Sequence, residues 1–175
     1  MNITVEPVKI EEKEILKNLL EKYLYEFSQW EKEDVNNLGL YGYDYLDHYW
    51  TEKNRFPFFI KVEHTLAGFV MINDYPESDI KTDYTMSEFF IMHKYRCLGI
   101  GTYTAHYLFD KFKGKWQLKY HPKNTASEQF WIKVVNECTK GNYEIIKSKA
   151  EDKYKDGTIG NILVFEIDGN GFNHE

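Results

Sequence analysis

The chain has 175 residues and a net charge of −6, and aromatic residues make up 17% of it. This length predicts one domain, the aromatic content excludes a disordered chain, and the acidic balance excludes the basic surface by which nucleic acids are bound. Two cysteines without a Cys/His cluster predict neither a disulfide framework nor a metal site. No apolar run reaches the roughly 20 residues of a membrane span, and the N-terminus does not resemble a signal peptide. We therefore expect a cytoplasmic protein with no membrane or nucleic-acid partner.

The first third of the chain predicts one strand and two helices. The strand covers Ile3–Val8, and a helix begins at about Glu11. Residues 36–50 are rich in tyrosine and predict a loop that enters a short second helix. Apolar residues in the first helix recur at helical spacing and predict one buried face: Ile15, Leu16, Leu19, Leu20, Tyr23, Leu24 and Phe27.

Strands dominate the middle of the chain. Phe56–Glu63 and Leu66–Asn73 are close enough in sequence to form a hairpin. A turn-rich loop follows, and Asp83–His93 then predicts a longer strand. Its apolar end, Phe89–Met92, indicates a strand that is covered on both faces.

Helices and strands alternate in the last part of the chain. Asn124 or Thr125 can cap the second of these helices, and Glu128 is placed to complete a capping box on Thr125. Residues 169–175 predict a frayed tail. The elements are a helix ending at about Phe112, a strand at Lys115–His121, a helix after Thr125, and strands at Tyr143–Lys147 and Asn161–Ile167. This order predicts an α+β or α/β fold, a mixed sheet with helices on both faces.

The segment Arg96-Cys97-Leu98-Gly99-Ile100-Gly101 lies at the junction between a predicted strand and a predicted helix. Two glycines two residues apart allow a tight turn and close approach of the backbone to a ligand. Amide groups at a helix start bind anions, and the helix dipole and Arg96 add positive potential. These properties suit a pyrophosphate, although the segment matches neither the dinucleotide-binding GxGxxG pattern nor a Walker loop. A glycine-bearing turn without a ligand is the alternative.

With its surroundings, this segment resembles the GNAT family of N-acetyltransferases. Arg96, Gly99 and Gly101 match the family pattern R/Q-x-x-G-x-G/A, and Asn124 heads a helix at the family's second cofactor position. His93 is a departure, because proline is common there. The order of elements is similar from Ile3 to Ile167, and residues 89–133 also resemble an uncharacterised bacterial subgroup of acetyltransferases.

The resemblance implies a single N-acetyltransferase domain over residues 1–168. Its central sheet would be mostly antiparallel, with six to seven strands, and would splay at the strand that binds the cofactor. Acetyl-CoA would be the co-substrate, with no metal. The cofactor-binding residues would be Phe89, Phe90 and Ile91 on the strand, Arg96, Cys97, Leu98, Gly99, Ile100, Gly101 and Thr102 in the phosphate cradle, and Asn124. For Asn124, helix capping alone is the alternative.

Acetyl transfer to an amine needs a base for the amine proton, a donor for the oxyanion and a leaving thiolate. The resemblance implies Glu88 as the base, and burial beside Phe89 and Phe90 would raise its pKa. An ordinary strand carboxylate paired with a lysine is the alternative. A backbone N–H near Ile91 would bind the oxyanion. Many relatives place a tyrosine acid where this chain has Trp131, whose ring N–H cannot supply a proton, so another group serves or the thiolate leaves unassisted.

The same resemblance brings the first two helices toward Glu88 on the acceptor side. Carboxylates and ring faces there suit a cation, which predicts direct attack by the primary amine of a small cationic acceptor such as a polyamine or aminosugar. The residues concerned are Trp30, Glu33, Asp34, Tyr41, Tyr43 and Tyr45, and the alternative is that the rings are core and the carboxylates face water. A non-catalytic acyl-CoA-binding or sensor domain and a protein or peptide N-acetyltransferase are the alternative functions. Either a monomer or a homodimer is consistent with the sequence.

Overall fold

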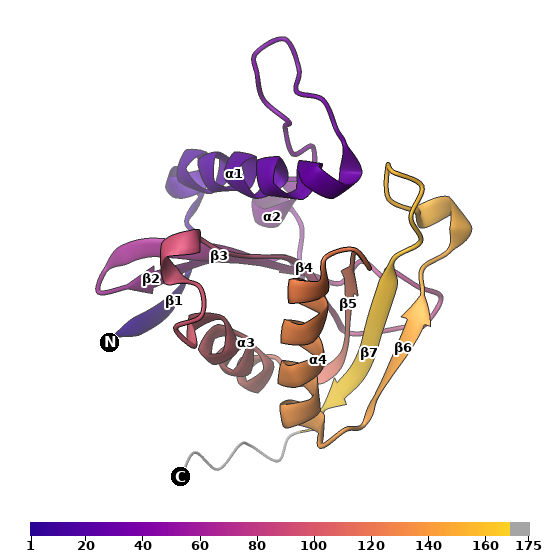
Figure 1. Ribbon diagram of the computed structural model, residues 1–175. Coiled ribbons are helices and arrows are strands. Elements are labelled where there is room, and N and C mark those ends of the chain that lie inside the picture. Colours follow the sequence, from indigo (N-terminus) through magenta and orange to yellow (C-terminus); the bar gives the residue numbers. More distant parts are fainter. Residues whose placement is uncertain (169–175) are drawn as a thin grey trace.

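A seven-stranded sheet organises the computed structural model, which describes residues 1–168 (Figure 1). The strand order is β1-β2-β3-β4-β5-β7-β6, and neighbouring strands are antiparallel except for the parallel pair β4 and β5. This mixed, mostly antiparallel sheet confirms the predicted fold class. The predicted frayed tail, residues 169–175, lies outside the described residues. The strands are β1 (Ile3–Pro7), β2 (Phe56–Val62), β3 (Thr65–Asn73), β4 (Tyr84–Ile91), β5 (Gly114–Tyr120), β6 (Tyr143–Lys147) and β7 (Asn161–Ile167).

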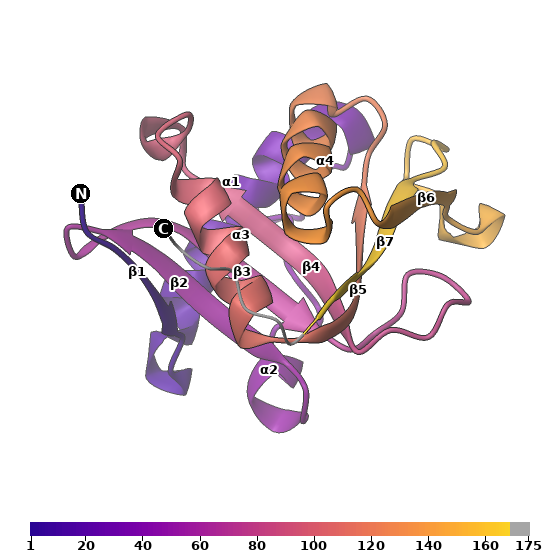
Figure 2. The same cartoon turned by 90° about the horizontal axis from the view of Figure 1, so that it is seen from below.

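Helices cover both faces of the sheet, and each face has its own apolar core. The helices α1 and α2 lie on one face and α3 and α4 on the other (Figures 1 and 2). Within residues 1–168, no helix is long and apolar enough to cross a membrane. The helices are α1 (Lys13–Glu31), α2 (His48–Thr51), α3 (Ile100–Lys111) and α4 (Thr125–Thr139), with short 3-10 turns η1 (Ile10–Glu12), η2 (His93–Tyr95) and η3 (Ala150–Asp152).

The helix α1 buries most of its predicted apolar stripe. Leu16 and Leu20 are almost fully buried, whereas Ile15 is 41% exposed, which corrects its predicted place on the stripe. Adjacent helical positions are about 100° apart, so a face centred on Leu16 and Leu20 leaves Ile15 at its edge. The helix ends at Glu31, and its C-cap residue Lys32 has a left-handed backbone with φ of 57°. The following loop projects away from the sheet before it returns to α2 (Figure 1).

The strand β4 separates from β5 after a short paired segment. Their pairing covers only Tyr84 with Trp116 and Thr85 with Gln117, although β4 continues to Ile91 and β5 to Tyr120. Beyond Thr85, β4 is therefore hydrogen-bonded to β3 alone. Its other backbone edge faces the gap between the two strands, which is the splay that the sequence resemblance implied.

A β-bulge interrupts β4 immediately before Glu88. Opposite Met71 and Ile72 of β3, the paired residues of β4 are Glu88 and Met86, so Ser87 is the extra residue. Met86 packs into the core beneath α3 and α4 before the bulge, and Phe89 packs there after it. Since side chains on a strand alternate between faces, an unbulged β4 would place Glu88 on the same face as Met86. The bulge turns Glu88 to the opposite face, beneath α1 and α2.

Candidate active site

The gap between β4 and β5 forms a cleft of about 860 Å³. Its walls come from the second half of α1, the separated part of β4, the loop before α3, the end of β5, the start of α4 and the β6–β7 loop. Most of the predicted site residues line this cleft: Trp30, Glu88, Phe89, Phe90, Ile91, Arg96, Cys97, Gly99, Gly101, Thr102 and Asn124. Leu98 and Ile100 do not, because Leu98 is 53% exposed at the surface and Ile100 is fully buried in the core.

The start of α3 forms an anion cradle in this cleft. Gly99 is the N-cap residue with φ of 79°, and within residues 1–168 no side chain caps the first turn of α3. A Cβ added at Gly99 would meet no atom within 4 Å, so this side of the turn is open. The first-turn amides of Ile100, Gly101 and Thr102 are therefore free to donate to a ligand, as at other phosphate-binding helix starts.

Gly101 lines the cleft and also has a packing role. A Cβ at this position would lie 3.2 Å from the ring of Phe130, a residue of α4. Its missing side chain thus allows α3 and α4 to pack closely, while its backbone amide remains part of the cradle.

The guanidinium of Arg96 is paired with Glu26 of α1. Its two terminal nitrogens donate to the Glu26 carboxylate at 2.6 and 2.7 Å, and its Nε donates to the Ile91 carbonyl at 2.7 Å. The bidentate pair neutralises the charge that Arg96 was expected to add to the cradle. Arg96 therefore ties α1 to the end of β4, and the positive potential of the cradle comes from its backbone amides.

Glu88 is partly buried and faces both the cleft and a pair of tyrosines. Tyr43 donates a hydrogen bond to Glu88 Oε1 at 3.0 Å, and the Tyr23 hydroxyl also lowers the pKa of Glu88. Burial raises the pKa of Glu88 to about 7, with smaller contributions from Glu77 and Glu31, while the two tyrosine hydroxyls lower it. A carboxyl with such a pKa takes up or releases a proton near neutral pH.

Three of the predicted acceptor residues lie away from the cleft, and these predictions are corrected. Asp34 is exposed on the loop after α1. The Tyr41 hydroxyl donates to Ser28 Oγ at 3.2 Å, and Tyr45 is 62% exposed. The reason is the left-handed end of α1 at Lys32, which directs the loop away from the sheet. Trp30 lines the cleft, Tyr43 donates a hydrogen bond to Glu88, and Glu33 pairs with Lys155 beside the cleft, so these three lie close to the site.

The cleft also contains acidic residues that the sequence did not identify. Glu31 at the end of α1 and Glu77 in the β3–β4 loop line it together with Glu88. Burial raises the pKa of both Glu31 and Glu77. Lys119 lies 3.7 Å from Glu77 and is the nearest compensating charge. No local sequence pattern marks these carboxylates, because only the folded chain brings α1 and the β3–β4 loop together.

Aromatic rings line the end of the cleft beside the β6–β7 loop. Tyr154 of the β6–β7 loop lies 5.9 Å from Phe27 and 4.5 Å from the buried His121, measured between ring centroids. Trp30 stacks on His121 at 6.2 Å. Lys155 forms an ion pair with Glu33 beside them, so the β6–β7 loop is attached to the end of α1.

Asn124 is the N-cap residue of α4, and Trp131 lies within the same helix. Trp131 is buried and packs edge-on against Phe89, with ring centroids 4.9 Å apart. Asn124 caps α4 by accepting a hydrogen bond from the Ser127 amide at 3.1 Å. The predicted capping box on Thr125 is therefore wrong, and Glu128 instead accepts a hydrogen bond from Tyr120. Burial, with a further contribution from that contact, raises the pKa of Tyr120 to about 12.

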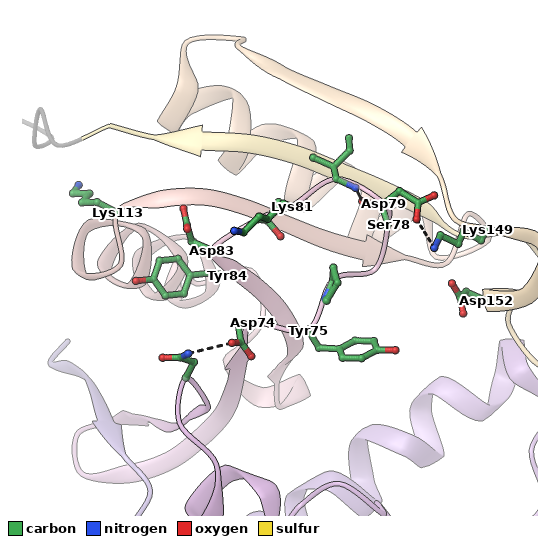
Figure 3. Close-up of a pocket in the computed structure, with 14 residues that line it drawn as sticks. Asp74, Tyr75, Ser78, Asp79, Lys81, Asp83, Tyr84, Lys113, Lys149 and Asp152 are labelled. Carbon is green, nitrogen blue, oxygen red and sulfur yellow. Dashed lines mark hydrogen bonds and ion pairs between the residues drawn. The ribbon is translucent and has the colours of Figure 1, made fainter.

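A second depression, of about 900 Å³, lies beside the β3–β4 loop (Figure 3). Its charged side chains largely pair with one another or with nearby polar groups. Lys149 pairs with Asp79 at 2.6 Å, and Asn54 donates to Asp74 at 3.1 Å. Neither Glu88 nor the cradle lines this depression, so the cleft between β4 and β5 is the candidate active site.

Substituting Glu88 by glutamine should change how stability depends on pH. The Glu88 pKa is about 7 in the folded chain and about 4.3 in an unfolded chain, so the folded chain binds this proton more tightly. The stability that the proton contributes is complete below about pH 4 and is lost as the pH rises to 7. We expect Glu88→Gln to raise the free energy of unfolding by about 1–3 kcal/mol at pH 8, with little change at pH 4, in urea unfolding experiments.

Glu166→Gln is the matched control, since Glu166 is an exposed carboxylate on a strand. The effect of Glu166→Gln on stability at each pH is the baseline against which the effect of Glu88→Gln is compared. An equal gain for Glu88→Gln at pH 4 and pH 8 would contradict the pKa assignment.

The chain matches the model of the acetyltransferase (GNAT) family over residues 17–134. Among curated protein sequences, none shows significant similarity to it. A ribosomal-protein-alanine N-acetyltransferase from Escherichia coli has a TM-score of 0.63 and 11% identity, with 99% of each chain covered. A GNAT family acetyltransferase from Elizabethkingia anophelis with acetyl-CoA bound has a TM-score of 0.60 and 15% identity, covering 95% of this chain and 99% of that one.

A chimeric spermidine N-acetyltransferase, with Vibrio cholerae as one source, has a TM-score of 0.59 and 13% identity. It covers 95% of this chain and 96% of the other. At these identities the solved structures show a shared fold, and the family match carries the assignment. Family membership favours an enzyme over the non-catalytic binding domain that the sequence left as an alternative. Because the match extends over more than half of the residues, the chain belongs to the acetyltransferase (GNAT) family and is an acetyl-CoA-dependent N-acetyltransferase.

Proposed function

We propose that this protein transfers an acetyl group from acetyl-CoA to the primary amine of a small cationic acceptor, with Glu88 as the base. The observation that carries the proposal is the Glu88 carboxyl, which has a pKa of about 7 and opens into the cleft beside the unpaired edge of β4. Cys97 and Cys138 are free thiols, in keeping with a reducing cytoplasm as the site of action.

The cofactor half of the cleft suits acetyl-CoA. The unpaired edge of β4 at Phe89, Phe90 and Ile91 offers backbone groups to the amide-containing pantetheine arm. The first turn of α3 offers amides to the pyrophosphate, and Asn124 can contact the arm while it caps α4. Acetyl-CoA supplies the activated thioester, and these residues orient it toward the acceptor side.

The chemistry proposed for the site is direct attack. Glu88 takes the proton that the acceptor amine must lose, while the amine nitrogen bonds to the thioester carbon and the carbon–sulfur bond breaks. A backbone N–H near Ile91 stabilises the oxyanion. Tyr120 keeps its proton because its pKa is about 12, and Trp131 has no acidic proton. The thiolate therefore leaves without a general acid.

The acceptor half of the cleft suits a positive charge. Glu31, Glu77 and Glu88 line it, and the charges of Glu77 and Glu31 raise the pKa of Glu88 by repulsion. Lys119 lies 3.7 Å from Glu77 and offsets part of this negative charge. An ammonium group in this space would relieve that repulsion and could contact the face of Trp30. The proposed acceptor therefore carries a second ammonium group, as a diamine or polyamine does.

A small acceptor fits the cleft better than a peptide. Tyr154 contacts Phe27 across the acceptor end, and the Lys155–Glu33 ion pair lies beside this contact. These contacts restrict the open groove that an extended peptide would need, which supports a small amine over the protein or peptide acceptor left as an alternative.

Removing the base should abolish most of the turnover. We expect Glu88→Gln to lower kcat by about 10²–10⁴-fold, the usual contribution of a general base, with acetyl-CoA affinity unchanged. Thiol release at saturating amine measures kcat, and calorimetry measures affinity. Glu166→Gln should behave as the parent. If Glu88→Gln stays within about threefold of the parent across pH 6–9, Glu88 is not the base.

The cradle can be tested at Gly99. A valine there would direct its Cβ into the open side of the turn and strain the left-handed backbone. We expect Gly99→Val to weaken CoA binding at least about tenfold, the ratio that corresponds to about 1.4 kcal/mol. Gly39→Val is the matched control, because Gly39 has φ of 74° and equally open surroundings on a distant loop. Parent-like CoA affinity in Gly99→Val by calorimetry would rule out the cradle.

The acceptor charge can be tested at Glu31. We expect Glu31→Gln to raise the KM for a diamine by about 3–10-fold with kcat nearly unchanged, since one charge-assisted contact is lost. The KM for a monoamine of equal length should change less. Asp34→Asn removes the same charge three residues away and outside the cleft, and it should alter neither KM. A preference of the parent for neutral or anionic acceptors would refute the proposed acceptor class.

A further inference from the structure

The contact between Tyr43 and Glu88 joins the loop before α2 to the proposed base. The Tyr43 hydroxyl donates to Glu88 Oε1 at 3.0 Å. We propose that Tyr43 is a positioning residue whose hydroxyl holds and stabilises the Glu88 carboxylate at the edge of the cleft. The inference rests on the proposed function, in which Glu88 receives the proton of the acceptor amine.

The loop that carries Tyr43 is anchored on both sides of it. The Glu21 carboxylate of α1 accepts hydrogen bonds from the Tyr41 amide at 2.8 Å and the Gly42 amide at 2.9 Å. After Tyr43, Leu46 is 5% exposed and packs into the core beneath α1. Two fixed points so close to Tyr43 restrict where its ring can lie. The hydroxyl is thus held in place before a substrate arrives.

Tyr43 can act only as a donor to Glu88. Burial, together with the neighbouring Glu88 charge, raises the pKa of Tyr43 well above its usual value. The same is true of Tyr23, which approaches Glu88 from α1. Both hydroxyls therefore keep their protons through the whole range in which Glu88 titrates, and neither competes with it as a base.

The groups around Glu88 divide into two opposing sets. Burial, Glu77 and Glu31 favour the protonated carboxyl, whereas the hydroxyls of Tyr23 and Tyr43 favour the carboxylate. Without the Tyr43 hydroxyl, the Tyr23 hydroxyl alone would favour the carboxylate against burial and the charges of Glu77 and Glu31. The titratable groups that face Glu88 are Tyr23 and Glu31 of α1, Tyr43 of the loop, Tyr49 of α2, Glu77 of the β3–β4 loop and Tyr154 of the β6–β7 loop.

Tyr43 lies outside the lining of the cleft and so acts through Glu88. The effect of Tyr43 on the reaction should therefore depend on pH. It should disappear at a pH high enough to ionise Glu88 without the Tyr43 hydrogen bond. A tyrosine with a merely structural role would lower activity equally at every pH. This difference separates the two roles experimentally.

The test is to measure the titration of Glu88 in the full-length protein with Tyr43→Phe. Carbon-13 NMR of labelled glutamate carboxyls follows each group, and the signal missing from Glu88→Gln identifies Glu88. We expect the midpoint for Glu88 to rise by about 1–2 pH units in Tyr43→Phe, the usual effect of a lost hydrogen bond to a charge. Tyr45→Phe is the matched control, because it removes an exposed hydroxyl from the same loop.

The pH profile of kcat/KM gives a second readout. In Tyr43→Phe the rising limb of this profile should shift to higher pH by the same amount. The value of kcat/KM should be about tenfold below that of the parent at pH 7 and within about threefold of it above pH 9. An unchanged Glu88 midpoint, or an equal loss of activity at all pH values, would overturn the inference. If instead Glu88→Gln keeps full turnover, the proposed base is wrong, and the NMR midpoint still tests the contact between Tyr43 and Glu88.

Discussion

The separation of β4 from β5 is the constraint on which the rest of the molecule depends. Past Thr85, β4 is paired with β3 alone. The strands β3 and β4 approach so closely that a Cβ at Gly68 of β3 would lie 2.0 Å from the Phe90 carbonyl oxygen of β4. This one-sided support leaves a row of backbone donors and acceptors facing the cleft, where a ligand can satisfy them. The cradle, the proposed base and the acceptor side are all arranged along that free edge.

The bulge at Ser87 links this backbone geometry to the chemistry. It turns Glu88 away from the apolar core beneath α3 and α4 and toward the tyrosines of α1 and the following loop. In that position burial opposes ionisation and two hydroxyls favour it, which brings the pKa to about 7. The arrangement sacrifices some stability at neutral pH, because the folded chain holds a carboxylate in surroundings that water would solvate better.

The sequence predicted the elements well because they depend on local patterns. The apolar end of β4, the glycines before α3 and the cap at Asn124 are signals within a few residues. The errors at the site arose from long-range geometry. Nothing local predicts the extra residue at Ser87, the pairing of Arg96 with Glu26, or Tyr154 reaching the cleft. Asp34, Tyr41 and Tyr45 were misplaced because a left-handed residue, Lys32, ends α1 and turns the loop away.

The charges along the cleft are distributed in a way that matches the two proposed substrates. Near the cofactor half, Arg96 and Glu26 neutralise each other, so an anionic cofactor meets helix amides and no unpaired carboxylate from this pair. In the acceptor half, Glu31, Glu77 and Glu88 outnumber Lys119. A cation entering this half lowers the repulsion among the carboxylates, and by doing so it favours the ionised form of Glu88. On the proposed function, binding of the correct acceptor would therefore help to prepare the base that activates it.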